Sequence, residues 1–116
     1  MAVVDRSRPE HATAIAGIRG FCHCPSSCRV IGRVKQDLIR LRLTKGQVLD
    51  RALQHIDAGL PIHCVMQTMY FETPQPGYII NPLIVAGIAI YFKVSLPQTE
   101  AGEKPYMLLM SVHEPD

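Results

Sequence analysis

The sequence predicts an α+β domain in which two helices pack on a mainly antiparallel sheet of about four strands. Three observations support this prediction. Apolar residues recur at helical spacing between residues 28 and 58, apolar and polar residues alternate after residue 61, and the two patterns do not interleave. With 116 residues and 47% hydrophobic composition, the chain can build one core, so we expect a single domain over residues 21–116. Residues 1–20 show weak periodicity and are expected to form a flexible or weakly helical arm.

The first predicted helix, from Cys28 to Leu43, has a basic face. Its apolar residues recur at helical spacing, whereas Arg29, Arg33 and Arg40 fall together on another side. The net charge of the whole chain is only +2, so binding to nucleic acid would depend on this local cluster. We therefore predict that the three arginines bind RNA phosphates. A contact surface for an acidic protein and an ordinary solvated helix face are the alternatives.

The second predicted helix runs from Lys45 to Ala58. Its start is marked by Thr44 as the N-cap and by Gln47 three residues later, which is the spacing of a capping box. Gly59 suits the position just after a helix, and Pro61 prevents the helix from continuing.

Four strands are predicted after this helix, at Ile62 to Met69, Tyr78 to Val85, Ile88 to Leu96 and Tyr106 to His113. Asn81-Pro82 confines the second strand to a sheet edge or forces a bulge, because proline cannot donate a ladder hydrogen bond. The third strand alternates, and five of its residues are expected to face the core: Ile88, Ile90, Phe92, Val94 and Leu96.

The last two strands carry side chains with useful chemistry. If the strands pair with Tyr91 opposite Ser111, one face of the sheet holds Ala89, Tyr91, Lys93, Ser111 and His113. Cleaving RNA without a metal ion requires an acid or base that titrates near neutrality, as histidine does, and fixed cations beside the phosphate. We therefore predict His113, Tyr91 and Lys93 as catalytic residues. The alternative is that they are ordinary residues on the outer face of the sheet.

Three segments of the last third of the chain also carry a family resemblance: Asn81-Pro-Leu-Ile-Val85-Ala-Gly87, Ile90-Tyr91-Phe-Lys93-Val and Leu108-Leu-Met-Ser111-Val-His113-Glu. They resemble the MqsR-like toxins, which belong to the wider RelE-like group of small toxins that cleave messenger RNA. The resemblance implies a RelE-like fold, endoribonuclease activity without a cofactor, and a cognate antitoxin protein as partner. It places Tyr91 at the active-site tyrosine and His113 at a C-terminal active-site position, where this family has lysine and other RelE-like toxins have histidine.

The sequence departs from that family at two positions that bear on activity. The family has an upstream active-site lysine, and this chain has no lysine between Lys45 and Lys93. The family's active-site glutamine does not align either, because Gly77 falls there by spacing and Gln75 lies only nearby. The missing lysine favours an alternative function, a non-enzymatic binding module or regulator of the same fold, carried by a phage or a plasmid.

Cysteines form the other notable cluster. Cys22, Cys24 and Cys28 lie within seven residues and can reach one zinc ion, with Cys64 or His63 as the fourth ligand. Redox-sensitive thiols before a helix, or buried and incidental cysteines, are the alternatives. Zinc bound here would stabilise the fold, and would not take part in the predicted catalysis.

The N-terminus shows no signal peptide, and the longest apolar run, from Leu83 to Phe92, is interrupted by glycine. It is also shorter than the about 20 residues that a membrane-spanning helix needs. We therefore expect a cytoplasmic protein with no membrane partner.

Overall fold

The computed structural model describes residues 2–67 and 73–115. Within them it is an α+β domain with three α-helices and a six-stranded mixed sheet, so the predicted class is confirmed but two helices and about four strands were too few. The elements in chain order are β1 (Ala2–Val3), α1 (Pro9–Cys22), the 3-10 helix η1 (Pro25–Ser27), β2 (Cys28–Val30), α2 (Gly32–Leu41), α3 (Lys45–Asp57), β3 (His63–Gln67), β4 (Gln75–Val85), β5 (Ile88–Ser95) and β6 (Met107–His113).

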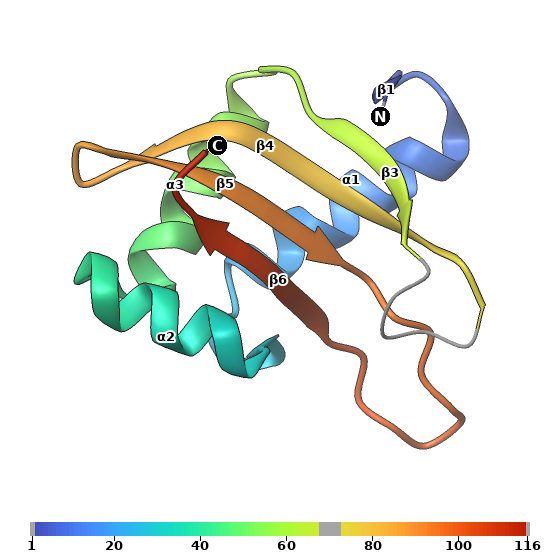
Figure 1. Ribbon diagram of the computed structural model, residues 1–116. Coiled ribbons are helices and arrows are strands. Elements are labelled where there is room, and N and C mark those ends of the chain that lie inside the picture. Colours follow the sequence, from blue (N-terminus) through green and yellow to red (C-terminus); the bar gives the residue numbers. More distant parts are fainter. Residues whose placement is uncertain (1, 68–72, 116) are drawn as a thin grey trace.

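The strands are ordered β1-β3-β4-β5-β6-β2, and β2 pairs with β6 in parallel while the other pairs are antiparallel. Figure 1 shows α1 and α3 behind the sheet and α2 beside β6. Buried residues of all three helices, among them Ile18, Val34 and Leu49, belong to one core with the inner face of the sheet. The opposite face carries no helix within the described residues, and we call it the outer face.

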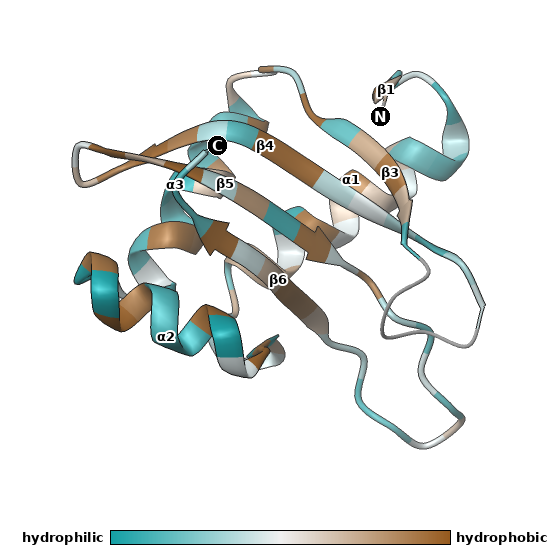
Figure 2. Cartoon of the chain, in the orientation of Figure 1, coloured by the Kyte–Doolittle hydropathy of each residue, from teal (hydrophilic) through white to brown (hydrophobic). Residues whose placement is uncertain are grey.

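Strand β5 shows how the sequence pattern builds this core. Hydrophobic and hydrophilic residues alternate along it (Figure 2). Ile90, Phe92 and Val94 are at most 1% exposed, as predicted, while Tyr91 and Lys93 on the outer face are only half-buried.

Helix α3 confirms the predicted capping box. The Thr44 hydroxyl accepts from the Gln47 amide N–H at 3.1 Å, and the Gln47 side chain accepts from the Thr44 N–H at 2.9 Å. Gly59 follows the helix with φ +72°, a left-handed conformation that glycine adopts without strain.

Helix α2 begins later than predicted. Cys28–Val30 form strand β2, which pairs with residues Met107 to Leu109 of β6, and the helix starts only at Gly32. The segment therefore satisfies its backbone groups at the edge of the sheet instead of within a helix turn, and the β-branched Val30 suits a strand. As a result, Arg29 lies on a strand and not on the predicted basic helix face.

The N-terminal segment predicted as an arm contains helix α1. Ile15, Ile18 and Cys22 are buried against the core, and Arg19 forms an ion pair with Asp57 at the end of α3 at 2.7 Å. No helix within the described residues is long and apolar enough to span a lipid bilayer.

Candidate functional site

The candidate site lies on the outer face, where β5 and β6 pair. Tyr91 is opposite His113 and Lys93 is opposite Ser111, so the predicted register, with Tyr91 opposite Ser111, was wrong by two residues. Because side chains on a strand repeat every second residue, a shift of two leaves the same residues on the same face. The predicted grouping of Tyr91, Lys93, Ser111 and His113 is therefore confirmed.

The two neighbours of β5, strands β4 and β6, each contain a β-bulge. On β4, the register shifts between Ile80 and Leu83, so Asn81-Pro82 lies opposite a single residue, Tyr91. On β6, Met110 is an extra residue between Leu109, which pairs with Val94, and Ser111, which pairs with Lys93. Bulges re-aim side chains and are common beside active sites, so their position on both sides of β5 supports a functional role for this part of the sheet.

A concavity of about 440 Å³ lies beside these bulges on the outer face. It is lined by Arg33, Asn81, Tyr91, Lys93, Ser111 and His113. Two of these side chains are cations and none is a carboxylate. Such a site favours an anion, and its two cations, phenol and imidazole can all contact a phosphate group.

The rings of Tyr91 and His113 are stacked. Their centroids lie 5.1 Å apart and their planes differ by 7°. The Nδ1–H group of His113 donates to the backbone carbonyl of Glu114 at 2.8 Å, because a carbonyl can only accept. In the neutral ring this bond leaves the lone pair on Nε2, which can then act as a base.

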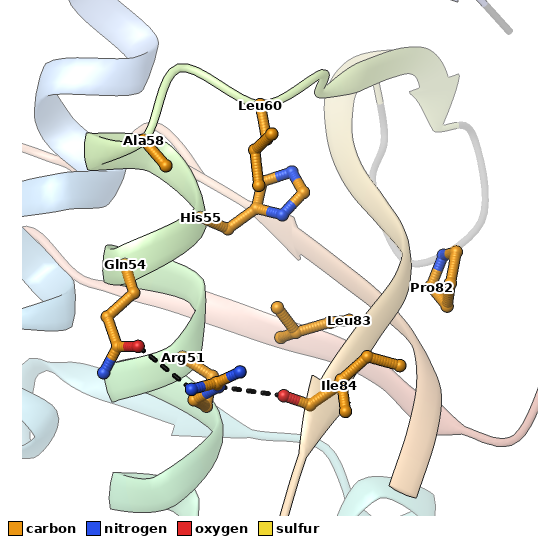
Figure 3. Close-up of a pocket in the computed structure, with 8 residues that line it drawn as sticks. All are labelled: Arg51, Gln54, His55, Ala58, Leu60, Pro82, Leu83 and Ile84. Atoms are coloured by element: carbon orange, nitrogen blue, oxygen red, sulfur yellow. Dashed lines mark hydrogen bonds between the residues drawn. The ribbon is translucent and has the colours of Figure 1, made fainter. Parts of the chain in front are cut away.

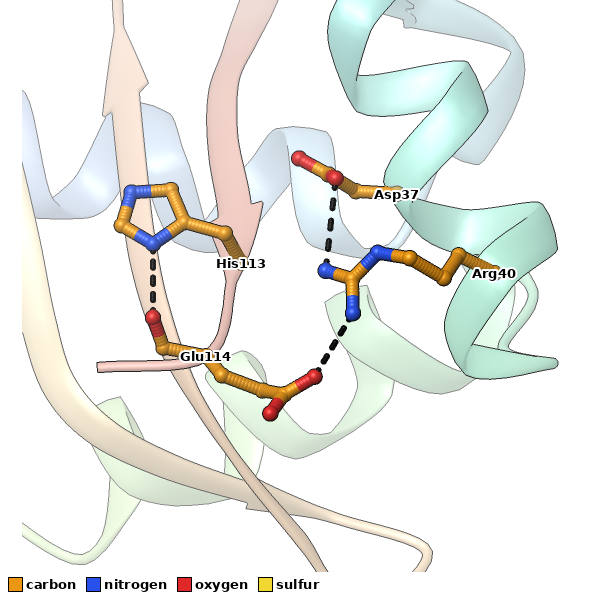
Figure 4. Close-up of polar contacts among 4 residues, drawn as sticks. All are labelled: Asp37, Arg40, His113 and Glu114. Atoms are coloured by element: carbon orange, nitrogen blue, oxygen red, sulfur yellow. Dashed lines mark hydrogen bonds and ion pairs between the residues drawn. The ribbon is translucent and has the colours of Figure 1, made fainter. Parts of the chain in front are cut away.

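The residue after His113 is anchored to helix α2. Figure 4 shows Glu114 between His113 and Arg40, with the Glu114 carboxylate 2.7 Å from the guanidinium. Arg40 also pairs with Asp37 at 3.4 Å, and its hydrogen bond to Glu114 is the main reason that its pKa is raised. These ion pairs hold the C-terminal segment against α2, beside the concavity. Arg40 therefore helps to position the segment that follows His113.

Burial shifts the acidity of two residues of the site. The half-buried position of Lys93 lowers the pKa of its ammonium group, and the nearby charge of Arg33 lowers that pKa further. Burial also raises the pKa of the Tyr91 phenol. Lys93 is therefore a stronger acid than an exposed lysine, whereas Tyr91 stays protonated at neutral pH and can only donate a hydrogen bond or stack.

Arg33 has a second contact in the site. Its guanidinium donates to the carbonyl of Met110, the bulged residue of β6, at 3.1 Å. The extra residue of a bulge has no pairing partner on the neighbouring strand. The hydrogen bond from Arg33 therefore satisfies a carbonyl group that β5 leaves without a donor.

The three arginines predicted to bind RNA do not converge on one surface. Arg33 lines the concavity, Arg40 is held by Asp37 and Glu114, and Arg29 stacks on Tyr106 near the other end of β6. The helical periodicity that grouped them does not apply to Arg29, because its segment is a strand.

The four cysteines predicted as zinc ligands are free thiols in different surroundings. Burial raises the pKa of Cys22 to about 12 and that of Cys28 to about 11, and it also raises the pKa of Cys64, which opposes the thiolate form that binds metal. Cys24 is exposed, and hydrogen bonds from Ser27 and Ser26 lower its pKa. No group of three or more His, Cys, Asp or Glu side chains in residues 2–67 and 73–115 is placed to hold a metal ion.

A second concavity, of about 390 Å³, lies between α3 and β4. Figure 3 shows that Arg51 reaches from α3 to the carbonyl of Ile84, at 2.9 Å, and also contacts Gln54. His55 Nε2 bonds to the carbonyl of Pro61 at 2.8 Å. The polar groups here bind the protein itself, so this concavity is a weaker candidate for chemistry than the one at Tyr91 and His113.

Sequence reasoning missed two residues of the site. Asn81 was considered only as part of a strand interruption, although an interruption beside a strand that carries a candidate residue is itself a signal of a bulge near a site. Gln67, whose amide oxygen accepts from Lys93 at 3.3 Å, lies on β3, and no local pattern relates it to β5.

Comparisons of the chain with protein-family models, with curated proteins and with solved structures each found no match.

Proposed function

We propose that the protein is a RelE-like toxin, similar to MqsR, that cleaves messenger RNA as a metal-independent endoribonuclease. The observation that carries the proposal is the stacked Tyr91 and His113 pair in a concavity that also contains Lys93 and Arg33. These side chains match the requirements of RNA cleavage: an acid and a base on either side of a phosphate, with cations beside it.

In the first step, the Nε2 lone pair of His113 accepts the proton of a 2′-hydroxyl group, and the 2′-oxygen attacks the adjacent phosphorus. Hydrogen bonding of Nδ1 to the Glu114 carbonyl supports this role, since it directs the basic nitrogen away from the backbone. Arg33 stabilises the charge that develops on the phosphate oxygens.

In the second step, the bond from phosphorus to the 5′-oxygen breaks and Lys93 donates a proton to that oxygen. Its lowered pKa makes Lys93 a suitable acid. His113 and Lys93 are diagonal neighbours on paired strands, which places their Cα atoms about 7–8 Å apart, a spacing that can hold one phosphate between them. The products are a 2′,3′-cyclic phosphate and a free 5′-hydroxyl group.

Tyr91 contributes in a different way. Its phenol remains protonated, so it donates a hydrogen bond to a phosphate oxygen, and its ring holds the imidazole in position by stacking. We expect Tyr91→Phe to keep the stacking and lose the hydrogen bond, with a smaller effect on cleavage than His113→Ala.

The test is cleavage of a single-stranded RNA by the purified chain in the presence of EDTA. The expected result is cleavage to cyclic phosphate ends by the wild type and a loss of about 10²–10⁴-fold in kcat for His113→Ala. His23→Ala, which removes an exposed histidine outside the concavity, is the matched control and should keep full activity. Absence of cleavage by the wild type, or equal activity of His113→Ala, would contradict the proposal.

Expression of the chain alone should arrest growth and degrade transcripts in the cytoplasm, where its substrate lies. A cognate antitoxin protein, the proposed partner, should relieve the arrest. Normal growth during expression of the wild-type chain would argue against a toxin.

The second candidate is a non-enzymatic binding module or regulator of the same fold. It is favoured by the lack of a lysine between Lys45 and Lys93, which leaves the family's upstream active-site lysine without a counterpart. RNA binding by the wild type without any cleavage would support this function over the first.

A further inference from the structure

A third concavity, of about 250 Å³, lies near the start of β6 and is separate from the candidate active site. It is lined by Ser26, Ser27, Arg29, Lys104, Pro105 and Tyr106. These residues come from three parts of the chain: η1, β2 and the segment that leads into β6. The lining thus combines two cations, two hydroxyl groups and one aromatic ring.

Arg29 and Tyr106 form the centre of this concavity. The Cζ atom of Arg29 lies 4.0 Å from the centroid of the Tyr106 ring, a cation-π contact that holds the guanidinium in place. Arg29 is exposed, and neither Arg29 nor Lys104 takes part in an ion pair within residues 2–67 and 73–115. By contrast, Arg19 and Arg40 are both paired with carboxylates.

The sheet register puts this concavity on the same face as the candidate active site. Arg29 pairs with Leu108, and Leu108 pairs with Ser95, which lies two residues after Lys93 on β5. Residues two apart on a strand share a face, so Lys93, Ser95, Leu108 and Arg29 all belong to the outer face.

The spacing between the two sites suits a single RNA strand. Leu108 lies five residues before His113 on β6, which corresponds to about 15 Å along the strand. Open sheet faces in RNA-binding domains bind roughly two or three nucleotides, by stacking bases on aromatic rings or guanidinium planes. Leu108, between the sites, is partly exposed, and Arg33 borders the first site from α2.

We propose that this concavity binds a second nucleotide of the same single-stranded RNA whose reacting phosphate lies at His113. Its base stacks on the Arg29 guanidinium, and its phosphate accepts a hydrogen bond from Lys104. The inference rests on the proposed function and adds to it a determinant of substrate length.

The test uses the full chain and two probes. One is a fluorescein-labelled single-stranded oligonucleotide of about ten nucleotides with a 2′-O-methyl group at every sugar, which binds but cannot be cleaved. The other is a dinucleotide substrate that occupies only the first site. Arg29→Ala and Tyr106→Leu should each weaken binding of the long probe by about 5- to 100-fold, as expected for loss of one stacked base, and should leave dinucleotide cleavage unchanged.

Lys35→Ala is the matched control, because Lys35 is an exposed cation of α2 that lies in neither concavity. Equal affinity of Arg29→Ala and the wild type for the long probe would overturn the inference, and so would an equal loss for Lys35→Ala. If Arg29→Ala loses binding to poly-glutamate but keeps the RNA affinity of the wild type, the surface would be assigned to an acidic protein, and the inference would also be overturned. A wild-type chain that neither binds nor cleaves RNA would refute the proposed function itself, which distinguishes the two failures.

Discussion

Deleting Met110 should leave His113 opposite Tyr91. Met110 is the extra residue of the β6 bulge, so without it Ser111 follows Leu109 directly, and the pairing of Val94 with Leu109 continues in register through to Tyr91 and His113. Ser111 and His113 then stay on the outer face and Val112 stays in the core, because faces alternate along a strand.

Two losses set the cost of this deletion. Met110 is fully buried, so the loss of its side chain costs about 1.5–3 kcal/mol. The hydrogen bond from the Arg33 guanidinium to the Met110 carbonyl is also lost, and a hydrogen bond to a charged group contributes about 1.5–3 kcal/mol. The total loss of stability is therefore about 3–6 kcal/mol, while the pairing of β6 with β5 and β2 is kept.

Three measurements test this prediction. Urea unfolding gives the stability, an RNA assay gives the activity, and a proton NMR contact between the Tyr91 and His113 rings reports the face directly. Met110→Ala is the matched control, since it loses the buried side chain but keeps the bulge, the ring contact and most of the activity. Deletion of Ala101 in the loop before β6 is a second control, because a loop absorbs the change in length. A deletion variant that folds but loses the contact between the Tyr91 and His113 rings would refute the reasoning.

Three further predictions concern charge and titration. Arg33→Met removes a cation that lowers the pKa of Lys93, so that pKa rises and the alkaline limit of cleavage moves to higher pH; an unchanged pH profile would contradict the assignment of Lys93 as the acid. Glu114→Gln releases the C-terminal segment from Arg40 and should lower kcat several-fold with almost no change in unfolding, and Arg40→Ala should add nothing to it in a double-mutant cycle. Burial raises the pKa of Cys22 from 9.0 to about 12, so the folded state keeps its proton where the unfolded state loses it. The contribution of Cys22 to stability should be constant below pH 9 and fall above it, by at most about 1.4 kcal/mol per pH unit, and Cys22→Ala should remove this part of the alkaline decline in urea titrations.

Local patterns predicted the elements whose stability is local. The capping box of Thr44 and Gln47 and the glycine at position 59 located α3, and the alternation from Ile88 to Val94 identified β5 and its buried face. Strand β2 was missed because its residues are helix-compatible by periodicity, and only the edge of β6 makes the extended form more favourable. Strand β1 has two residues, too few to show any period.

The candidate site divides in the same way. The sequence by itself determined that Tyr91 and Lys93 share the outer face of one strand, because a period of two is a property of the backbone. That His113 shares this face was decided by the tertiary structure. Leu109 pairs with Val94, and His113 reaches the position opposite Tyr91 only because the bulge leaves Met110 out of the pairing between them. The bulge is in turn held by Arg33 from α2, a contact over 77 positions in the chain that no local pattern reveals. Side-chain chemistry is written in the sequence, but the face on which it is presented depends on long-range hydrogen bonds that only the folded chain can form.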